Sequence, residues 1–289
     1  MSDDDPIPLG EPQRFLFVGG PGRSGTTLMG RTLGMHSQVS YLEETFLLFR
    51  YRQVRDVTHH LYRDAWPDVR AGKEALLRPG QVRRQKGAER VTRGDVNRST
   101  DRMSRFWLQV MVERLGIPPD EVILDKSPRD VAHYSWGVSN LPRSRYLVMV
   151  RDPRAVIASR LEQEQRRKDT GYVPGARPSA DDLDRAAYWA KQWVDYLAIA
   201  EAAQRHNAER VLFVQYRDML LEPARVAEAA QAFVYLDPEP EVTSYLETGG
   251  YRDGLLTDQL DSWKDRLHNE VIAAVVETVG ARIEPFESG

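Results

Sequence analysis

The chain has 289 residues, a formal net charge of −3 at pH 7 and no cysteine. This length suits one large α/β domain or two small ones, and the slightly acidic balance argues against a nucleic-acid binder, which usually carries a basic domain. The missing cysteine excludes disulfides, thiolate nucleophiles and cysteine-based zinc sites, and it favours a cytoplasmic protein. High arginine and alanine contents suggest a bacterial source with a GC-rich genome.

The first 13 residues, MSDDDPIPLGEPQ, predict a disordered tail. They are acidic and contain proline, and they lack the basic start and the apolar run of a secretory signal. No apolar segment reaches the length needed to cross a bilayer, so we expect no membrane span.

The stretch FLFVGGPGRSGTTLMGRTL, residues 15–33, contains a Gly-x-x-x-x-Gly frame from Gly20 to Gly25. The apolar run before the frame predicts a buried parallel strand, and the residues after it predict a helix over about 26–36. Backbone N–H groups of such a turn, together with the helix N-terminus, bind anions. Nucleotide triphosphatases place a lysine where this chain has Thr26, and they use it with magnesium. Because Thr26 replaces the lysine, while Arg23 lies inside the frame and Thr27 is placed to bond an oxygen directly, we expect a less charged phosphate-like group and no metal.

A strongly charged region follows, over about 50–105, with basic residues prevailing in its second part, 78–105. Two interpretations stay open: a solvated helical insertion, or a cap over the active site that helps to select the acceptor. Apolar residues at helical spacing in DRMSRFWLQVMVERLGI predict a helix over about 100–115.

Three further apolar runs predict parallel strands: EVILDKSP, RYLVMVRDP and RVLFVQYRDML. Asp125 and Lys126 stand at the carboxyl end of the first. Strands that alternate with helices predict a doubly wound α/β sheet, in which ligands bind beyond the carboxyl ends of the strands. The polar loop over 166–182 lies where a lid would be placed, and a long helix follows it. We expect the aromatic residues of that helix to be core residues; they are Trp189, Trp193 and Tyr196.

The motifs GRSGTTL, LEET and VRDPRAVIASR resemble those of sulfotransferases that use 3′-phosphoadenosine 5′-phosphosulfate (PAPS), and within that family most of all the tyrosylprotein sulfotransferases. The resemblance runs from about residue 15 to 266 and implies a P-loop-like three-layer fold, with a central parallel sheet flanked by helices. It implies that Arg151 and Ser159 hold the 3′-phosphate, and arginine suits this role because it binds phosphate through two parallel hydrogen bonds. By the same resemblance the 5′-phosphosulfate is held by Arg23, Ser24, Gly25, Thr26 and Thr27.

The resemblance also implies catalytic roles. Glu44, the second glutamate of LEET, would be the general base, and Lys126 would stabilise the oxygen that bridges phosphorus and sulfur, a task that Arg23 would share. His36 and His133 are alternative bases, and Glu43 is a candidate for orienting the loop.

Tyr216 matches a strand-end tyrosine of the family, and the match around Ser262 and Lys264 is looser. Tyr216 either faces the nucleotide or belongs to the core, and Lys264, with Ser262, would close over the 3′-phosphate. Gly22 replaces the usual proline, which predicts a more flexible turn. The membrane anchor and the disulfides of the tyrosylprotein enzymes have no counterpart in this chain, so their acceptor is not carried over.

Together these features predict a single sulfotransferase domain over residues 14–289 with a helical, basic insertion at about 50–105. We expect sulfuryl transfer from PAPS to a hydroxyl of a small molecule such as a secondary metabolite, a sugar or a lipid, with no nucleic-acid partner and with a homodimer as an open alternative. A P-loop kinase and a nucleotide-binding regulatory protein without transfer activity are the competing interpretations.

Overall fold

The computed structural model describes residues 14–60, 102, 106–107, 109–110, 112–168, 171–250, 257 and 260–286. The chain divides into two compact units, one comprising residues 1–12 and 47–118 and the other residues 13–46 and 119–289. The tail over 1–13 and the basic stretch over 61–101 lie outside the described residues.

The smaller unit contains a helix over residues 47–60, in which Leu47, Leu48 and Tyr51 are buried. Its described residues between 102 and 115 are helical, as the apolar spacing predicts.

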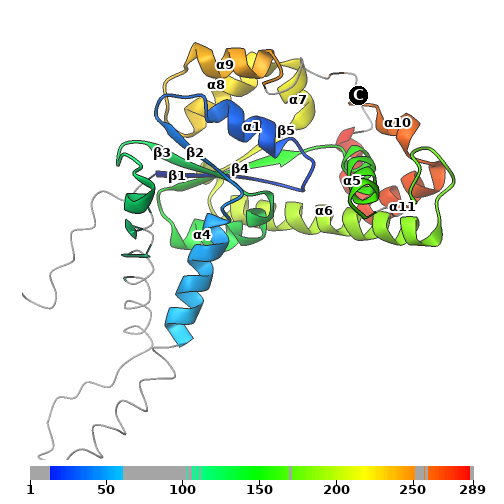
Figure 1. Ribbon diagram of the computed structural model, residues 1–289, viewed down its shortest axis with the longest axis horizontal. Coiled ribbons are helices and arrows are strands. Elements are labelled where there is room, and N and C mark those ends of the chain that lie inside the picture. Colours follow the sequence, from blue (N-terminus) through cyan, green and yellow to red (C-terminus); the bar gives the residue numbers. More distant parts are fainter. Residues whose placement is uncertain are drawn as a thin grey trace, which may run out of the picture. The chain divides into compact units, whose positions relative to one another are not determined.

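The larger unit is built on a five-stranded sheet in the order β2-β3-β1-β4-β5 (Figure 1). Every pair of neighbouring strands is parallel, which confirms the predicted α/β fold. Because β1 connects toward β2 and β4 connects toward β5, the chain reverses its direction of winding between these two central strands, where such sheets bind ligands. The strands are β1 (Arg14–Gly19), β2 (Val39–Glu43), β3 (Val122–Lys126), β4 (Ser144–Val150) and β5 (Val211–Gln215).

The central strands β1, β3 and β4 are buried almost throughout, as expected for continuous apolar runs in a parallel sheet. Strand β2, with the sequence VSYLE, was not among the predicted strands. It lies at the edge of the sheet and is only half-buried, so polar residues occur along it. A strand of this kind lacks the continuous apolar run by which the other strands were predicted.

Two layers of helices cover the sheet (Figure 1). One layer consists of four helices that pack on one another: α1 (Thr26–Leu33), α7 (Tyr216–Leu221), α8 (Pro223–Phe233) and α9 (Pro240–Glu247). The other is arranged around the long helix α6 (Ala180–His206), and it contains η1 (Pro128–His133), α4 (Tyr134–Asn140), α5 (Pro153–Lys168) and α11 (Asn269–Val279). The remaining elements are the short segments η2 (Ala208–Arg210), α10 (Trp263–Arg266) and η4 (Gly280–Phe286).

Helix α1 ends three residues earlier than predicted. The N–H groups of Met35 and His36 bond to the carbonyls of Thr32 and Leu33, three residues back, which tightens the chain into a turn.

Helix α6 begins with a capping box, in which Ser179 and Asp182 bond reciprocally. Its Trp193 is 1% exposed and belongs to the core, as expected. The same expectation is wrong for Trp189 and Tyr196, which are only half-buried. Both line a surface pocket described below.

The loop before α6 begins later than predicted, because α5 extends to Lys168. Its described part is bound to the end of α10: the Gly175 N–H and the Tyr172 hydroxyl both donate to the Arg266 carbonyl, each at 2.9 Å. Within the described part of the chain, no helix combines the length and the apolar character that crossing a membrane requires.

Candidate functional site

The loop between β1 and α1, which we call the 20–27 loop, has a conformation that glycine makes possible. Gly20 and Gly25 have positive φ angles of +141° and +88°. A Cβ atom on Gly20 would lie 2.4 Å from the Met149 carbonyl oxygen, and one on Gly25 would lie 2.5 Å from the Tyr216 ring. Arg23 also adopts a left-handed φ, +77°. Glycine is therefore required at both ends of the frame, because neighbouring atoms leave no room for a Cβ and because both backbones have a positive φ.

This loop presents donors without partners at the start of α1. Gly25 caps the helix and supplies no side-chain hydrogen bond, so the first-turn N–H groups have no side-chain acceptor there. The Ser24 hydroxyl is fully buried and has no hydrogen-bond partner among the described residues. Thr26 is buried and Thr27 half-buried beside it. A buried donor without a partner destabilises the protein unless a ligand binds it, so this loop fits an anion.

Side chains after β4 join the loop directly. Arg23 Nε donates to Ser159 Oγ at 2.9 Å, and Arg151 Nη1 donates to the Arg23 carbonyl at 3.2 Å. The Arg151 guanidinium lies 4.3 Å from the centre of the Tyr216 ring, which is buried beneath the loop. The Trp193 indole N–H in turn donates to the Arg151 carbonyl at 3.1 Å. The loop motif GRSGTTL and the motif VRDPRAVIASR, which the sequence analysis assigned to the two ends of a nucleotide, are thus joined by direct contacts.

A second cluster, which we call the lysine cluster, consists of Arg31, Glu43, Glu44 and Lys126. Lys126 is 1% exposed, and its Nζ lies 3.1 Å from Glu43 Oε1 and 3.1 Å from Glu44 Oε1. The other oxygen of Glu43 pairs with Arg31 Nη2 at 3.0 Å. Burial raises the pKa of Glu43, but the hydrogen bonds from Arg31 and Lys126 outweigh it and hold that pKa below its ordinary value.

The backbone after β2 is strained at Glu44. This residue has a φ of +53°, and its N–H donates to the Lys126 carbonyl at 2.9 Å. Phe46 has a φ of +54°, and its N–H is held by Ser127 Oγ at 3.0 Å. Residues other than glycine keep such conformations only where the surroundings enforce them, and they concentrate at functional sites.

Other candidate residues lie elsewhere. His36 is buried at the far end of α1; its Nδ1 accepts from the Gln38 N–H and its Nε2 bonds to the Asp237 carbonyl, each at 3.0 Å. Both ring nitrogens are therefore engaged in structural hydrogen bonds. His133 ends η1. Lys264 is largely exposed and pairs with Asp261 at 3.1 Å, so its described contacts do not bring it to the 20–27 loop.

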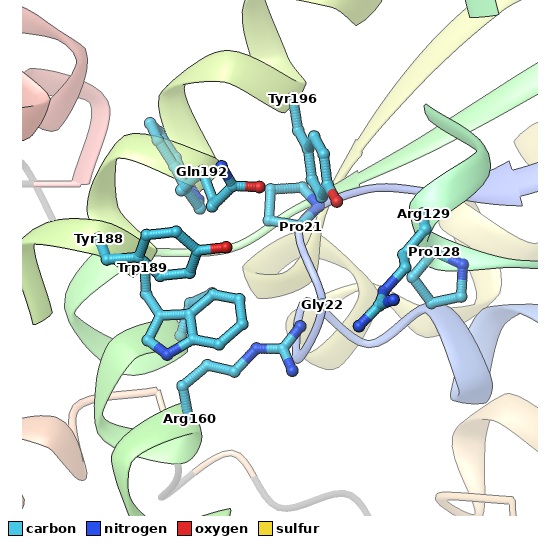
Figure 2. Close-up of a pocket in the computed structure, with 11 residues that line it drawn as sticks. Pro21, Gly22, Pro128, Arg129, Arg160, Tyr188, Trp189, Gln192 and Tyr196 are labelled. Carbon is cyan, nitrogen blue, oxygen red and sulfur yellow. The ribbon is translucent and has the colours of Figure 1, made fainter. Parts of the chain in front are cut away.

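A pocket of about 240 Å³ borders the 20–27 loop, and sequence reasoning missed it. Arg160 stands against the loop: its Nη2 atom lies 1.8 Å from where a Cβ on Gly22 would be. The glycine at position 22, where the family usually has proline, was the sequence signal for this pocket, because a residue without a side chain leaves room for the Arg160 guanidinium. Figure 2 shows the described residues around it, which are Pro21, Gly22, Pro128, Arg129, Val156, Arg160, Tyr188, Trp189, Gln192, Trp193 and Tyr196.

Among the described residues, no group of three or more His, Asp or Glu side chains is arranged to hold a metal ion.

A parallel sheet with the glycine-rich 20–27 loop at its topological switch point, between β1 and β4, is typical of P-loop-like α/β proteins. The model of the sulfotransferase family matches residues 16–240, and the chain belongs to that family. It is similar to a protein-tyrosine sulfotransferase of Drosophila melanogaster, with 26% identity over 72% of this chain and 35% of that protein. With protein-tyrosine sulfotransferase 1 of Danio rerio it shares 23% identity over 92% of this chain and 66% of that protein. The chain thus spans between about one third and two thirds of these two relatives.

Among solved structures, the chain is similar to the sulfotransferase domain of the Synechococcus PCC 7002 olefin synthase. The TM-score is 0.54 and the identity 15%, with 92% of this chain and 94% of that domain covered. At this identity the likeness supports the fold.

Proposed function

We propose that this protein transfers a sulfuryl group from PAPS to the hydroxyl of a small molecule. The observation that carries the proposal is the contact chain from Ser159 through Arg23 to Arg151. It joins an anion loop after β1 to an arginine after β4, so two anionic groups of one nucleotide have adjacent sites. Membership in the sulfotransferase family supports the same donor.

The residues present fit this donor. The unpartnered hydroxyl of Ser24 and the uncapped N-terminus of α1 suit the sulfuryl end, with Gly25, Thr26 and Thr27 in the same turn. Arg151 and Ser159 suit the 3′-phosphate, and Tyr216 supports Arg151 from below. The donor, when bound, supplies a sulfur atom open to in-line attack and a phosphate as leaving group.

The lysine cluster supplies the groups that such a transfer needs. Glu44 accepts the proton of the acceptor hydroxyl as the new S–O bond forms. Lys126 and Arg23 donate hydrogen bonds to the phosphate oxygen on which negative charge grows as the old S–O bond breaks. Glu43 keeps Lys126 in place, because its Oε1 atom pairs with the Lys126 ammonium while its Oε2 atom pairs with Arg31.

The acceptor proposal rests on the pocket beside Gly22, whose volume of about 240 Å³ suits a small molecule. The relatives are named for protein tyrosine as acceptor, but the chain spans only part of their length. We further propose a single cytoplasmic sulfotransferase domain over 14–289, in which residues 50–105 are an insertion.

Calorimetric titration without magnesium tests the donor. We expect 3′-phosphoadenosine 5′-phosphate (PAP) to bind at least about tenfold more tightly than adenosine 5′-monophosphate, ADP or ATP, because only PAP fills both anion sites. Arg151→Met should remove this preference, whereas Arg217→Met, which changes an exposed arginine of α7, should keep it. A preference for ATP would favour a kinase instead, and absence of binding would contradict the proposed donor.

A further inference from the structure

The pocket beside Gly22 combines an aromatic wall with positive charge. Tyr188, Trp189, Trp193 and Tyr196 all come from one side of α6 and form the wall. Arg129 enters from η1 and Arg160 from α5. Of the described residues that line the pocket, none is acidic.

Two neighbouring side chains contact the Arg160 guanidinium. It stacks over the Trp189 ring, 4.5 Å from the ring centre, and bonds weakly to Gln163 at 3.4 Å. Gly22 lets it approach the 20–27 loop, since any Cβ there would overlap Nη2. Figure 2 shows the Arg160 guanidinium beside Gly22, with Arg129 approaching the same loop from the η1 side.

No carboxylate lines the pocket beside its two arginines among the described residues. In the part of the chain that the structure describes, neither Arg129 nor Arg160 forms an ion pair. Glu164, on the same helix as Arg160, accepts from the Trp189 indole N–H at 3.2 Å and does not line the pocket. Burial, followed by the neighbouring charges of Arg23 and Arg129, lowers the pKa of Arg160 and outweighs the opposing attraction of Glu164. A half-buried cation such as Arg160, with other cations nearby, favours the binding of an anion.

The pocket also adjoins the loop proposed to hold the sulfuryl group. Pro21 and Gly22 belong to the same loop as Arg23, so one wall of the pocket is the loop proposed to hold the sulfuryl group. An acceptor in this pocket would therefore lie next to the proposed sulfuryl site.

We propose that this pocket is the acceptor subsite and that it selects a small hydroxylated aromatic acid, whose ring packs on the α6 aromatic wall and whose anionic group binds Arg160. This inference rests on the proposed sulfuryl transfer. The volume of about 240 Å³ lies below the usual range of about 300–1,000 Å³ for drug-sized ligands, so a single ring fits better than a fused ring system. Arg129, which is exposed, is placed to attract the same anion.

The test compares two probes of equal shape that differ in charge, 4-hydroxyphenylacetate and 4-hydroxyphenylacetamide, each titrated by calorimetry into PAP-saturated protein. We expect the acid to bind at least about tenfold more tightly than the amide, as charge-assisted pairing with arginine implies. Arg160→Met should abolish the preference and leave PAP affinity within about twofold. The matched control is Arg167→Met, which removes an exposed arginine from the same helix and should preserve the preference.

Arg129→Met provides a second test at an exposed position, in case Arg160→Met does not fold. We expect it to reduce the preference for the acid about two- to fivefold, because a surface charge is screened by solvent.

Three outcomes would overturn the proposal: equal binding of the two probes, no binding of either at millimolar concentration, or a loss of PAP affinity in Arg160→Met as large as the loss of acid affinity. The last would assign Arg160 to the donor site. If the wild-type protein does not bind PAP, the proposed function fails by itself. The same titrations on the protein alone then still test the charge preference of the pocket.

Discussion

Two groups of cations lie near the 20–27 loop, and they are balanced in different ways. Lys126 is almost completely buried, and two carboxylates hold it at 3.1 Å each, with Arg31 completing the lysine cluster. Arg160 is only partly buried, and an indole ring and an amide hold it, without a carboxylate among the described residues. The first group is complete within the protein and can keep its geometry without a ligand. The second suits an anion from outside, which is why we assign catalysis to one and substrate selection to the other.

The largest effect on kcat should come from replacing one of the two carboxylates of the lysine cluster, and the two replacements should differ. We expect Glu44→Gln to lower kcat about 10²- to 10⁴-fold, because general base catalysis is lost while the shape is kept. Glu43→Gln should lower kcat less than about tenfold, since Glu43 positions Lys126 and Arg31 and accepts no proton. Steady-state kinetics of the two variants, with PAP affinity as a control, make the comparison. Equal losses would remove the distinction between base and positioning residue.

Lys126 should rank next. Replacement by Met fills nearly the same space in a buried position, and we expect a fall in kcat of about 10²- to 10³-fold, as for the loss of one preorganised donor to a developing charge. PAP affinity should change little, because the 20–27 loop and Arg151 are untouched. Lys191→Met, at an exposed site of α6, serves as the control. Turnover at the wild-type rate in Lys126→Met would show that this buried ammonium is structural.

The two glycines on either side of Arg23 and Ser24, Gly22 and Gly25, should respond differently to alanine. Gly25→Ala combines a φ of +88° with a Cβ 2.5 Å from the Tyr216 ring, so we expect a stability loss of about 1–3 kcal/mol and weaker PAP binding. Gly22→Ala meets only the end of the Arg160 side chain, which can move, so stability should fall by less than about 1 kcal/mol. Thermal unfolding measures the stability of both variants. A greater loss in Gly22→Ala would contradict this order.

Gly22→Ala should have its main effect on the acceptor. The added methyl group displaces Arg160 from the loop, so the preference for 4-hydroxyphenylacetate over its amide should fall about two- to fivefold. Calorimetry measures this ratio, and an unchanged ratio would mean that Arg160 does not depend on Gly22 for its role.

The smallest expected effect is the pH dependence of stability that Glu43 provides. Because the folded-state pKa of Glu43 lies below its ordinary value of 4.5, its contribution is complete above about pH 4.5 and is lost as the pH falls through the folded-state pKa. Glu43 is more than a third exposed, so solvent screens it, and Glu43→Gln should lower Tm by at most about 2 °C at pH 7. The difference between wild type and variant should shrink in melting curves recorded at successively lower pH below 4.5. A difference that does not change with pH would have another cause.

Much of the donor side could be predicted from local sequence. Apolar runs that end in glycine or in charged residues mark four of the five strands, and the 20–27 loop follows from glycine spacing next to a strand. The edge strand β2 escaped because its residues are half-buried and polar residues alternate along it. The pocket also escaped, since aromatic residues at helical spacing in α6 look the same whether they face the core or a cavity.

What the sequence by itself determined is the set of short-range features: the turn that Gly20 and Gly25 permit, the strand that ends at Lys126, and the helix that starts after Arg151. These depend on residues close together in the chain, where steric limits and apolar periodicity act. Only the tertiary structure decided that Arg23 bonds to Ser159, 136 positions away, that Lys126 is shared by two carboxylates, and that Arg160 rests on Gly22. Such contacts depend on strand order and on the packing of α6 against the sheet, because parallel strands bring the carboxyl ends of distant segments to one edge.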